Sequence, residues 1–316
     1  MATLADLEAY CQQYNSSLGE TYCQDILVIT LNDGETTQFS NSFEGIGSQA
    51  APFDGEIYIL QADTTVGYTF ELNRPLFNYV TDAVKINYYV VGESGGTTPI
   101  ELDLIRNGYS ETPLLADHVV KSSTKSGNVT WKVRADYYKD ADGENTNAYA
   151  FAGLFGTIES GAEITVEYDN SATVGGVSAS THSAANAGMI CGEMQDNAVL
   201  HLTELKGTNT NGDVSTTSGD AGGLVGRMLS GSRLEIGSIT PDYNARTIST
   251  RNGYAGGLVG YCDGGTVVLP DDYIYAMKSG STITGTTAAG GLFGYLRNTS
   301  AVEFDLASDY SIDSVT

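Results

Sequence analysis

The stretch Gly222-Gly223-Leu224-Val225-Gly226 is one of five similar stretches in the chain. The others are Ala152-Gly153-Leu154-Phe155-Gly156, Gly188-Met189-Ile190-Cys191-Gly192, Gly256-Gly257-Leu258-Val259-Gly260 and Gly290-Gly291-Leu292-Phe293-Gly294. Their closing glycines are 36, 34, 34 and 34 residues apart. Self-similarity at a period of this size is typical of solenoid proteins, in which each repeat packs only against its neighbours.

The glycines of the motif suit tight corners and a close approach of the backbone. The alternative is a loop that binds phosphate groups through its backbone amides. That alternative is excluded because no Lys-Ser or Lys-Thr pair follows the glycines and because the motif recurs five times.

Two further segments of each repeat have the composition of short strands. One is a largely alternating run such as Ser232-Arg233-Leu234-Glu235-Ile236, and the other is a more polar run such as Thr247-Ile248-Ser249. Short alternating runs with β-branched residues, joined by turns of Gly, Asn, Asp and Ser, indicate strands, and no repeat shows a helical period. The predicted fold is therefore all-β: a right-handed parallel β-helix with three-strand coils and a period of about 34 residues.

Stacked coils place equivalent residues in ladders, and two apolar positions per repeat predict buried ladders. The first ladder is Leu154, Ile190, Leu224, Leu258 and Leu292. The second ladder is Ile158, Met194, Met228, Cys262 and Leu296. Cys191 and Cys262 are accordingly expected to be small buried hydrophobic residues. Cys11 and Cys23 are close enough in sequence to pair in an oxidising setting.

The pattern extends upstream without its glycines. Residues 75–80 and 113–118 copy the motif with Leu76 and Leu114 at the position of the repeat leucine, which gives leucine steps of 38 and 40 residues. We therefore expect about seven coils from Leu76 to the end. Residues 3–11 predict a short amphipathic helix that caps the first coil.

The predicted organisation is one continuous solenoid in three parts. Residues 1–74 form the helical cap and the lead-in coil or coils, residues 75–151 form irregular coils with long loops, and residues 152–316 form the regular coils. The polar run 311–316 stops just before the next glycine pair is due, so we expect a segment of a longer array.

The chain is strongly acidic, with 15 Lys and Arg against 39 Asp and Glu and a formal net charge of −24. Such a surface repels phosphate backbones and anionic lipids, so nucleic acids and membrane surfaces are poor partners. No apolar run approaches the roughly 18 residues that a membrane span needs, and residues 1–7 lack the features of a signal peptide. We expect an extracellular segment of an exported protein, monomeric within its longer chain.

The glycine repeats resemble the GLUG-type repeats of large bacterial surface proteins. Gly45-Ile46-Gly47, Pro52-Phe53-Asp54-Gly55 and Leu76-Phe77-Asn78-Tyr79-Val80 add to the resemblance, since they are similar to the block that leads into the first coil of those proteins. The resemblance covers most of the chain and implies a secreted or wall-anchored protein. Such proteins include adhesins, and the repeats also accompany peptidases that cut immunoglobulin A. The chain departs from the family pattern by lacking glycines in its first two coils and by its loops at 92–112 and 136–148.

Candidate catalytic groups are scattered along the chain. Asp271-Asp272 is the densest pair of carboxylates for glycoside hydrolysis, but a solvated loop is the preferred interpretation. Lys121 and Lys125 can supply the base of a polysaccharide lyase, although nothing in the sequence organises them. No motif of a serine hydrolase, zinc peptidase or cysteine enzyme is present. We expect that the chain is not an enzyme.

No cofactor or metal is expected. The three histidines lack the spacing of metal ligands, and His201 lies in a predicted strand as an ordinary solenoid residue. The segment 140–145 is calcium-like, but neither register places its glycine and glutamate as an EF-hand loop requires. A plain acidic turn is preferred, and Ca²⁺ near Asp140 and Asp142 is the alternative.

Two surfaces are candidate binding sites because tyrosine is a preferred contact residue and long loops carry function. One is the outward position three residues after the repeat leucine, which reads Tyr79, Asp117, Thr157, Glu193, Arg227, Tyr261 and Tyr295. The other is the irregular region, with Tyr88, Tyr89, Tyr109, Trp131, Tyr137 and Tyr138. Tyr261 and Tyr295 form either a binding face or a cross-strand pair that stabilises the sheet by roughly 0.2–1 kcal/mol.

The leading hypothesis is a bacterial cell-surface adhesin or binding module. It presents a rigid β-helix to a host protein, such as immunoglobulin, mucin or matrix, or to a glycan. The first alternative is a structural stalk without a ligand. The second is a carbohydrate-active β-helix enzyme, which a groove lined by aromatic residues and paired carboxylates would support.

Overall fold

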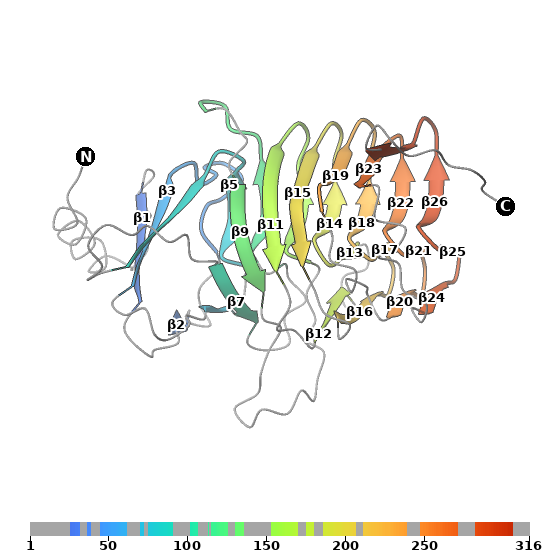
Figure 1. The fold of residues 1–316 in the computed structure, drawn as a ribbon, viewed down its shortest axis with the longest axis horizontal. Helices are drawn as coiled ribbons and strands as arrows, with labels where there is room; N and C mark the ends of the chain where they lie inside the picture. Colours follow the sequence, from blue (N-terminus) through green and yellow to red (C-terminus); the bar gives the residue numbers. More distant parts are fainter. Residues whose placement is uncertain are drawn as a thin grey trace, which may run out of the picture.

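The computed structural model shows an all-β solenoid of parallel strands (Figure 1). It describes residues 26–31, 37–38, 45–61, 70–72, 75–90, 102–106, 113, 115–125, 130–135, 153–169, 175–179, 186–206, 211–238, 247–270 and 282–305. Every named element in these residues is a strand. The helix predicted for residues 3–11 lies outside the described residues. Within the described ranges, no helix has the length and apolar character needed to cross a membrane.

Two long sheets run the length of the solenoid. The seven-stranded sheet contains, in spatial order, β5 (Phe77–Thr81), β8 (Ala116–Val120), β10 (Phe155–Ile158), β14 (Cys191–Met194), β18 (Val225–Met228), β22 (Val259–Asp263) and β26 (Phe293–Arg297). The nine-stranded sheet contains β2 (Thr37–Gln38), β4 (Phe70–Leu72), β7 (Leu102–Arg106), β9 (Thr130–Ala135), β11 (Glu163–Asp169), β15 (Val199–Lys206), β19 (Arg233–Ile236), β23 (Thr266–Pro270) and β27 (Ala301–Asp305).

Three smaller sheets complete the described fold. One four-stranded sheet contains β12 (Gly175–Ala179), β16 (Asn211–Thr216), β20 (Thr247–Thr250) and β24 (Thr282–Gly285). The other contains β13 (Ala187–Gly188), β17 (Ala221–Gly222), β21 (Tyr254–Gly256) and β25 (Ala288–Gly290). The three-stranded sheet contains β1 (Ile26–Leu31), β3 (Glu56–Gln61) and β6 (Lys85–Val90).

The number of turns and strands differs from the sequence prediction. From β13 to β24 the chain passes three times through both four-stranded sheets and both long sheets, so the described residues form about three complete turns. The prediction of about seven coils is not supported. One sheet has seven strands, but complete turns are described only between β13 and β24. The prediction of three strands per coil is wrong for these turns, which have four, because the residues around the glycine pair form a short strand of their own.

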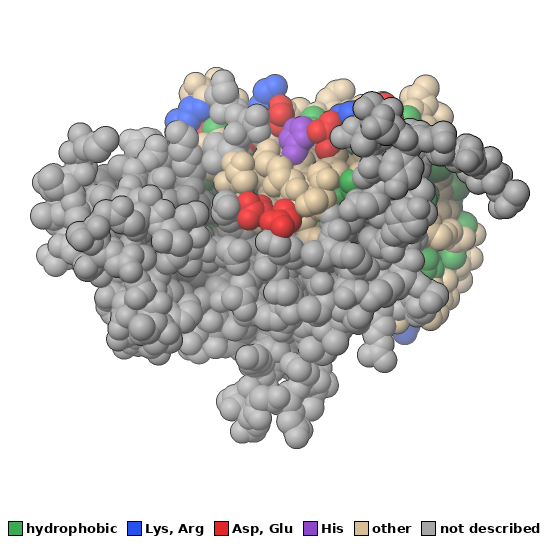
Figure 2. Space-filling model, in the orientation of Figure 1, with side chains coloured by type: hydrophobic (Ala, Val, Ile, Leu, Met, Phe, Trp, Pro, Cys, Tyr) green, Lys and Arg blue, Asp and Glu red, His purple; other side chains and the backbone are tan. Residues whose placement is uncertain are grey.

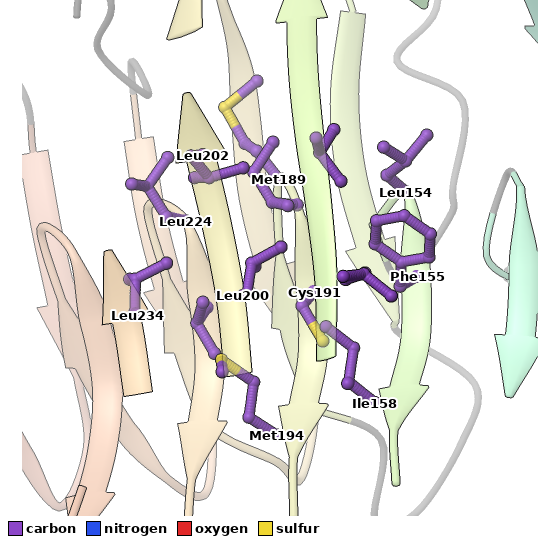
Figure 3. Packing of buried hydrophobic residues seen from close by; sticks show 14 of the residues in the cluster. Leu154, Phe155, Ile158, Met189, Cys191, Met194, Leu200, Leu202, Leu224 and Leu234 are labelled. Atoms are coloured by element: carbon purple, nitrogen blue, oxygen red, sulfur yellow. The ribbon is translucent and has the colours of Figure 1, made fainter. Parts of the chain in front are cut away.

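The two predicted apolar ladders are confirmed except at their last members: Leu292 is only partly buried, and Leu296 is exposed. Leu154, Ile190, Leu224 and Leu258 are buried, and each backbone position bonds the next turn, as in the bond from Leu224 N to Leu258 O (2.9 Å). Met194 pairs with Met228, which pairs with Cys262. Figure 3 shows several of these side chains together in the interior. Stacking of equivalent residues therefore builds one continuous core.

Close backbone approach explains the repeated glycines. A Cβ atom on Gly257 would collide with the carbonyl oxygen of Gly291 in the next turn. A Cβ atom on Gly222 would collide with the carbonyl oxygen of Val225 at the corner that leads into β18. The motif thus needs glycine where two stretches of backbone touch, as the sequence predicted.

One register was assigned wrongly from the sequence. Leu115, and not Leu114, is the repeat leucine: it is buried, and its carbonyl oxygen accepts from Phe77 N (2.9 Å) while its own N donates to Leu154 O (2.9 Å). Two adjacent leucines left the choice open to sequence patterns, since a shift by one residue moves every side chain to the other face. The correction moves Asp117 out of the outward ladder and places His118 in it.

Candidate functional site

The outward ladder of the seven-stranded sheet carries the candidate site. Strand register places Tyr79, His118, Thr157, Glu193, Arg227, Tyr261 and Tyr295 in one row across the sheet. Because successive strands are hydrogen-bonded, their side chains at this row are direct neighbours. Apart from the exchange of Asp117 for His118, the row is the one that the sequence predicted.

A second row, missed in the sequence, packs against this ladder. The residue before each Ala-Gly pair lies seven positions before the ladder residue of the same turn. Asn186 Nδ2 donates to Glu193 Oε2 (2.9 Å), and Arg227 donates to Asp220 Oδ2 from Nε (2.8 Å) and approaches it with Nη2 (2.7 Å). In the following turn the same two positions are Tyr254 and Tyr261. The sequence signal for this second row was the residue before each Ala-Gly pair, which is polar or aromatic and differs from turn to turn.

Tyr254, Tyr261 and Tyr295 form a compact group, here called the tyrosine cluster. The ring centroids of Tyr254 and Tyr295 are 4.7 Å apart, those of Tyr254 and Tyr261 5.4 Å, and those of Tyr261 and Tyr295 5.6 Å. The planes of Tyr261 and Tyr295 differ by only 10°. Aromatic rings at these separations attract one another, so the cluster holds its shape.

Small and charged neighbours shape the cluster. Ala288 occupies the row of Tyr254 in the last described turn, so it leaves room for the Tyr254 ring to stack on Tyr295. On the other side, the Arg227 guanidinium lies 5.2 Å from the centroid of the Tyr261 ring, which is within cation–π range. Arg227 is fixed in turn by the buried carboxylate of Asp220.

A polar rim borders the tyrosine cluster and consists of Asp263, Arg297 and Asn298. The Tyr261 hydroxyl donates to Asp263 Oδ2 (3.2 Å), and Asn298 Nδ2 donates to Asp263 Oδ1. Arg297 Nη1 lies 4.0 Å from Asp263 Oδ2. The Tyr261 hydroxyl and then the Asp263 carboxylate raise the pKa of Arg297, so its guanidinium stays charged.

The other predicted binding residues that the structure describes lie elsewhere in the fold. Tyr88 and Tyr89 lie on β6 of the three-stranded sheet, opposite Ile59 and Leu60 of β3. Trp131 is buried, and its Nε1 donates to Val84 O (2.8 Å), so it is a core residue. Predicted residues outside the described part of the chain are Tyr109, Tyr137, Tyr138, Asp140, Asp142 and the pair Asp271-Asp272.

The opposite end of the outward ladder also holds a tyrosine, but in different surroundings. The ring of His118 lies flat on that of Tyr79, with centroids 4.2 Å apart and planes within 2°. Burial, and then the carboxylates of Glu159 and Asp117, raise the pKa of Tyr79. Tyr79 therefore differs from the tyrosine cluster in having acidic surroundings.

A charged ladder crosses the nine-stranded sheet. His201 on β15 directs Nδ1 to Glu235 Oε2 on β19 (2.6 Å) and Nε2 to Glu163 Oε1 on β11 (3.1 Å). Arg233 donates to Glu235 and, through Nη1, to Glu303 Oε2 (3.0 Å). Figure 2 shows a face of the molecule on which acidic side chains lie on either side of a histidine. His201 is in a strand, as predicted, but register was needed to find its carboxylate partners.

A groove of about 450 Å³ lies beside this ladder, and His201, Thr203, Arg233, Glu235, Gly237 and Glu303 are among its lining residues. Burial raises the pKa of Glu235, but hydrogen bonds from Arg233 and His201 outweigh burial and leave it below its usual value of 4.5. The charged side chains that line the groove are therefore paired with one another by hydrogen bonds.

Lys125, a candidate base in the sequence, takes part in a loop contact. Its Nζ donates to the carbonyl oxygen of Asp54, while Thr124 Oγ1 donates to Asp54 Oδ2 (2.7 Å). Burial raises the pKa of Asp54, but hydrogen bonds from Thr81 and Thr124 lower it overall. These contacts join the loop after β8 to the segment before β3.

Among the described residues, no three His, Cys, Asp or Glu side chains are grouped in a way that holds a metal ion. Comparison of the chain with known proteins found no matching family model, no matching curated protein and no matching solved structure. The likeness to GLUG-type repeats therefore stays a prediction from the sequence.

Proposed function

We propose that the chain is a binding segment of a bacterial cell-surface protein with GLUG-type repeats. It presents a rigid β-solenoid whose side contacts a host protein or a glycan outside the cell. The observation that carries this proposal is the tyrosine cluster, in which Tyr254 of β21 packs against Tyr261 and Tyr295 of the outward row. Clustered aromatic residues on a rigid scaffold are typical of recognition surfaces, because little side-chain entropy is lost on binding.

The degree of exposure supports the same proposal. Among the described residues, Tyr295 and Leu296 are the exposed large hydrophobic residues, at 40% and 46%, and both lie on β26, the edge strand of the seven-stranded sheet beyond which no strand is described. An aromatic ring held in place by two others and still open to solvent is available for contact with a ligand.

The finer architecture that we propose is a right-handed solenoid with about seven coils, including irregular ones upstream of β12. The stacking of β5, β8 and β10 on the regular strands of the seven-stranded sheet supports this extension. The upstream coils would then belong to the same rod as the regular repeats.

A binding screen tests the proposed function. The purified chain is passed over immobilised immunoglobulin A, immunoglobulin G, mucin, collagen and fibronectin, and over a glycan array. We expect saturable binding to at least one of these, weakened at least tenfold in the double variant Tyr261→Ala, Tyr295→Ala. Tyr79→Ala, at the same row of β5, serves as the matched control and should bind within twofold of the unaltered chain.

Two outcomes would contradict the proposal. A folded, monomeric sample that binds none of these probes at micromolar concentration leaves the stalk as the better account. Binding that survives the double variant but is lost in a variant of another face would place the site away from the tyrosine cluster.

A further inference from the structure

The tyrosine cluster is small compared with a protein interface. A stable interface buries on the order of 800 Å² on each partner, and one large aromatic residue contributes about 150–250 Å² when it is fully covered. Tyr254 and Tyr261 are already partly buried, and Tyr295 is 40% exposed. The accessible patch therefore suits a ligand of a few rings better than a folded protein.

The chemistry of the cluster and its rim is that of a saccharide site. One face of a pyranose ring presents C–H groups, which are attracted to the electron-rich face of an aromatic ring. Its hydroxyl groups need hydrogen-bond donors and acceptors at the edge of that stack. Asp263 supplies acceptors, Arg297 supplies donors and Asn298 supplies both, all within the rim that touches Tyr261.

The local charge is balanced. Arg227 is paired with Asp220 through two close contacts, and Arg297 lies beside Asp263. Each guanidinium at the cluster thus lies near a carboxylate that offsets its charge. The chain as a whole carries a formal charge of −24, which repels polyanions.

We infer that the tyrosine cluster, with Asp263, Arg297 and Asn298, is a binding site for a neutral saccharide of one to three units. The sugar stacks its C–H face on the face of Tyr295 that Tyr254 and Tyr261 leave uncovered, and its hydroxyl groups exchange hydrogen bonds with the rim. This inference rests on the proposed function and names the class of ligand that its site takes.

The test is a printed array of neutral oligosaccharides built from glucose, galactose, mannose and N-acetylhexosamines, beside sialylated, uronate-containing and sulfated glycans. Titration calorimetry with the strongest free oligosaccharide then gives the affinity. We expect binding to neutral glycans, a loss of at least tenfold in affinity for Tyr295→Ala, and a loss of less than threefold for Tyr295→Phe, which keeps the ring. Asp263→Asn should weaken binding because the rim loses an acceptor.

Controls separate binding from folding. Tyr79→Ala removes a tyrosine from the same row at the other end of the sheet and should leave the affinity within twofold. Circular dichroism and thermal melting of every variant show that the solenoid is intact. If Tyr295→Ala unfolds the last turns, Tyr295→Leu is used, because it keeps an apolar side chain without a flat ring.

The possible failures are distinguishable. Preference for sialylated or sulfated glycans through the same tyrosines would overturn the inference about charge while the proposed function stands. Binding to a protein, lost in Tyr295→Ala and without any glycan signal, would overturn the saccharide inference alone. Absence of every ligand in the wider screen would overturn both.

Discussion

At the scale of single residues, one atom decides whether a glycine can be replaced. Gly257 and Gly291 occupy the same position in successive repeats, yet a Cβ atom on Gly257 meets the backbone of the next turn whereas a Cβ atom on Gly291 has open space around it. Neither glycine has a positive φ, so backbone strain is not the cause. The two sites therefore isolate the cost of crowding between turns.

Gly257→Ala should destabilise the chain by about 1–3 kcal/mol, because the backbone of adjacent turns must move apart. Gly291→Ala should be neutral, or stabilising by up to about 1 kcal/mol, because alanine restricts the unfolded chain. Urea denaturation followed by circular dichroism measures both. Equal effects of the two substitutions would show that crowding is not the reason for the glycine.

Cys191 gives a second prediction at this scale. Burial raises the pKa of its thiol from 9.0 to about 12. Because the folded value lies above the unfolded one, the neutral thiol stabilises the fold fully below pH 9.0, and this contribution is lost as the pH rises toward about 12.

Native Cys191 should therefore resist alkylation at pH 8 and react rapidly in urea, as measured by mass spectrometry of the peptide that contains it. Cys191→Ala should lose less stability than the unaltered chain between pH 9 and pH 12 (the window of the shifted pKa). Rapid alkylation of the native thiol would contradict its buried position.

At the scale of strands, sequence patterns predicted the stacking of the core strands but missed the shortest strands and the contacts between polar side chains. The repeat leucines and the alternating runs were sufficient for the core ladders, because the apolar period and the strand period coincide there. The short strand formed by Ala221 and Gly222 was missed, since two residues carry no periodicity. Asp220 and Arg227, or His201 and Glu235, could not be paired beforehand because each contact depends on register or on the corner between sheets.

The charged ladder of the nine-stranded sheet gives a prediction at this scale. The folded pKa of Glu235 lies below the ordinary value of 4.5, so its carboxylate stabilises the fold above that pH, and this contribution is lost as the pH falls through the folded value. Because the side chain is 33% exposed, Glu235→Gln should cost only about 0.5–1 kcal/mol at pH 7. The difference from the unaltered chain should shrink below pH 4.5, as measured by urea denaturation across pH.

Glu303→Gln is the matched control for this ladder. Glu303 contacts Arg233 but has no hydrogen bond to His201, and its side chain is 52% exposed. Its substitution should therefore change stability by less than about 0.5 kcal/mol. A pH-independent effect of Glu235→Gln would argue against the ion pairs as its cause.

At the scale of the whole molecule, the repeats are interchangeable units. Gly222 pairs with Gly256, and Val225 pairs with Val259, so one turn can be joined to the next but one without a change of register. The stability of such a solenoid is roughly the sum of repeat and interface contributions. The sequence predicted this repeating organisation, and the described residues contain about three complete turns of it.

Deletion of residues 223–256, which joins Gly222 to Gly257, should leave a folded but less stable chain. The spectrum in circular dichroism should keep its β character, and the melting temperature should fall because one repeat and one interface are lost. Deletion of residues 223–239 is the control: it removes half a turn, breaks the register and should prevent folding of the turns that follow. Failure of the first deletion to fold would contradict the independence of the repeats.

The direction of the hydrogen bonds has a mechanical consequence. Strands stand side by side along the longest axis of the molecule, so the bonds between turns run along that axis (Figure 1). Tension applied along the axis pulls directly on the hydrogen bonds between the outermost turn and its neighbour. The turns then detach one at a time, and the strands of a whole sheet are not sheared together. Each detached turn of 34 residues releases extended chain about 110–120 Å long. Under tension along the axis, the regular turns should therefore open one after another, in steps of similar length.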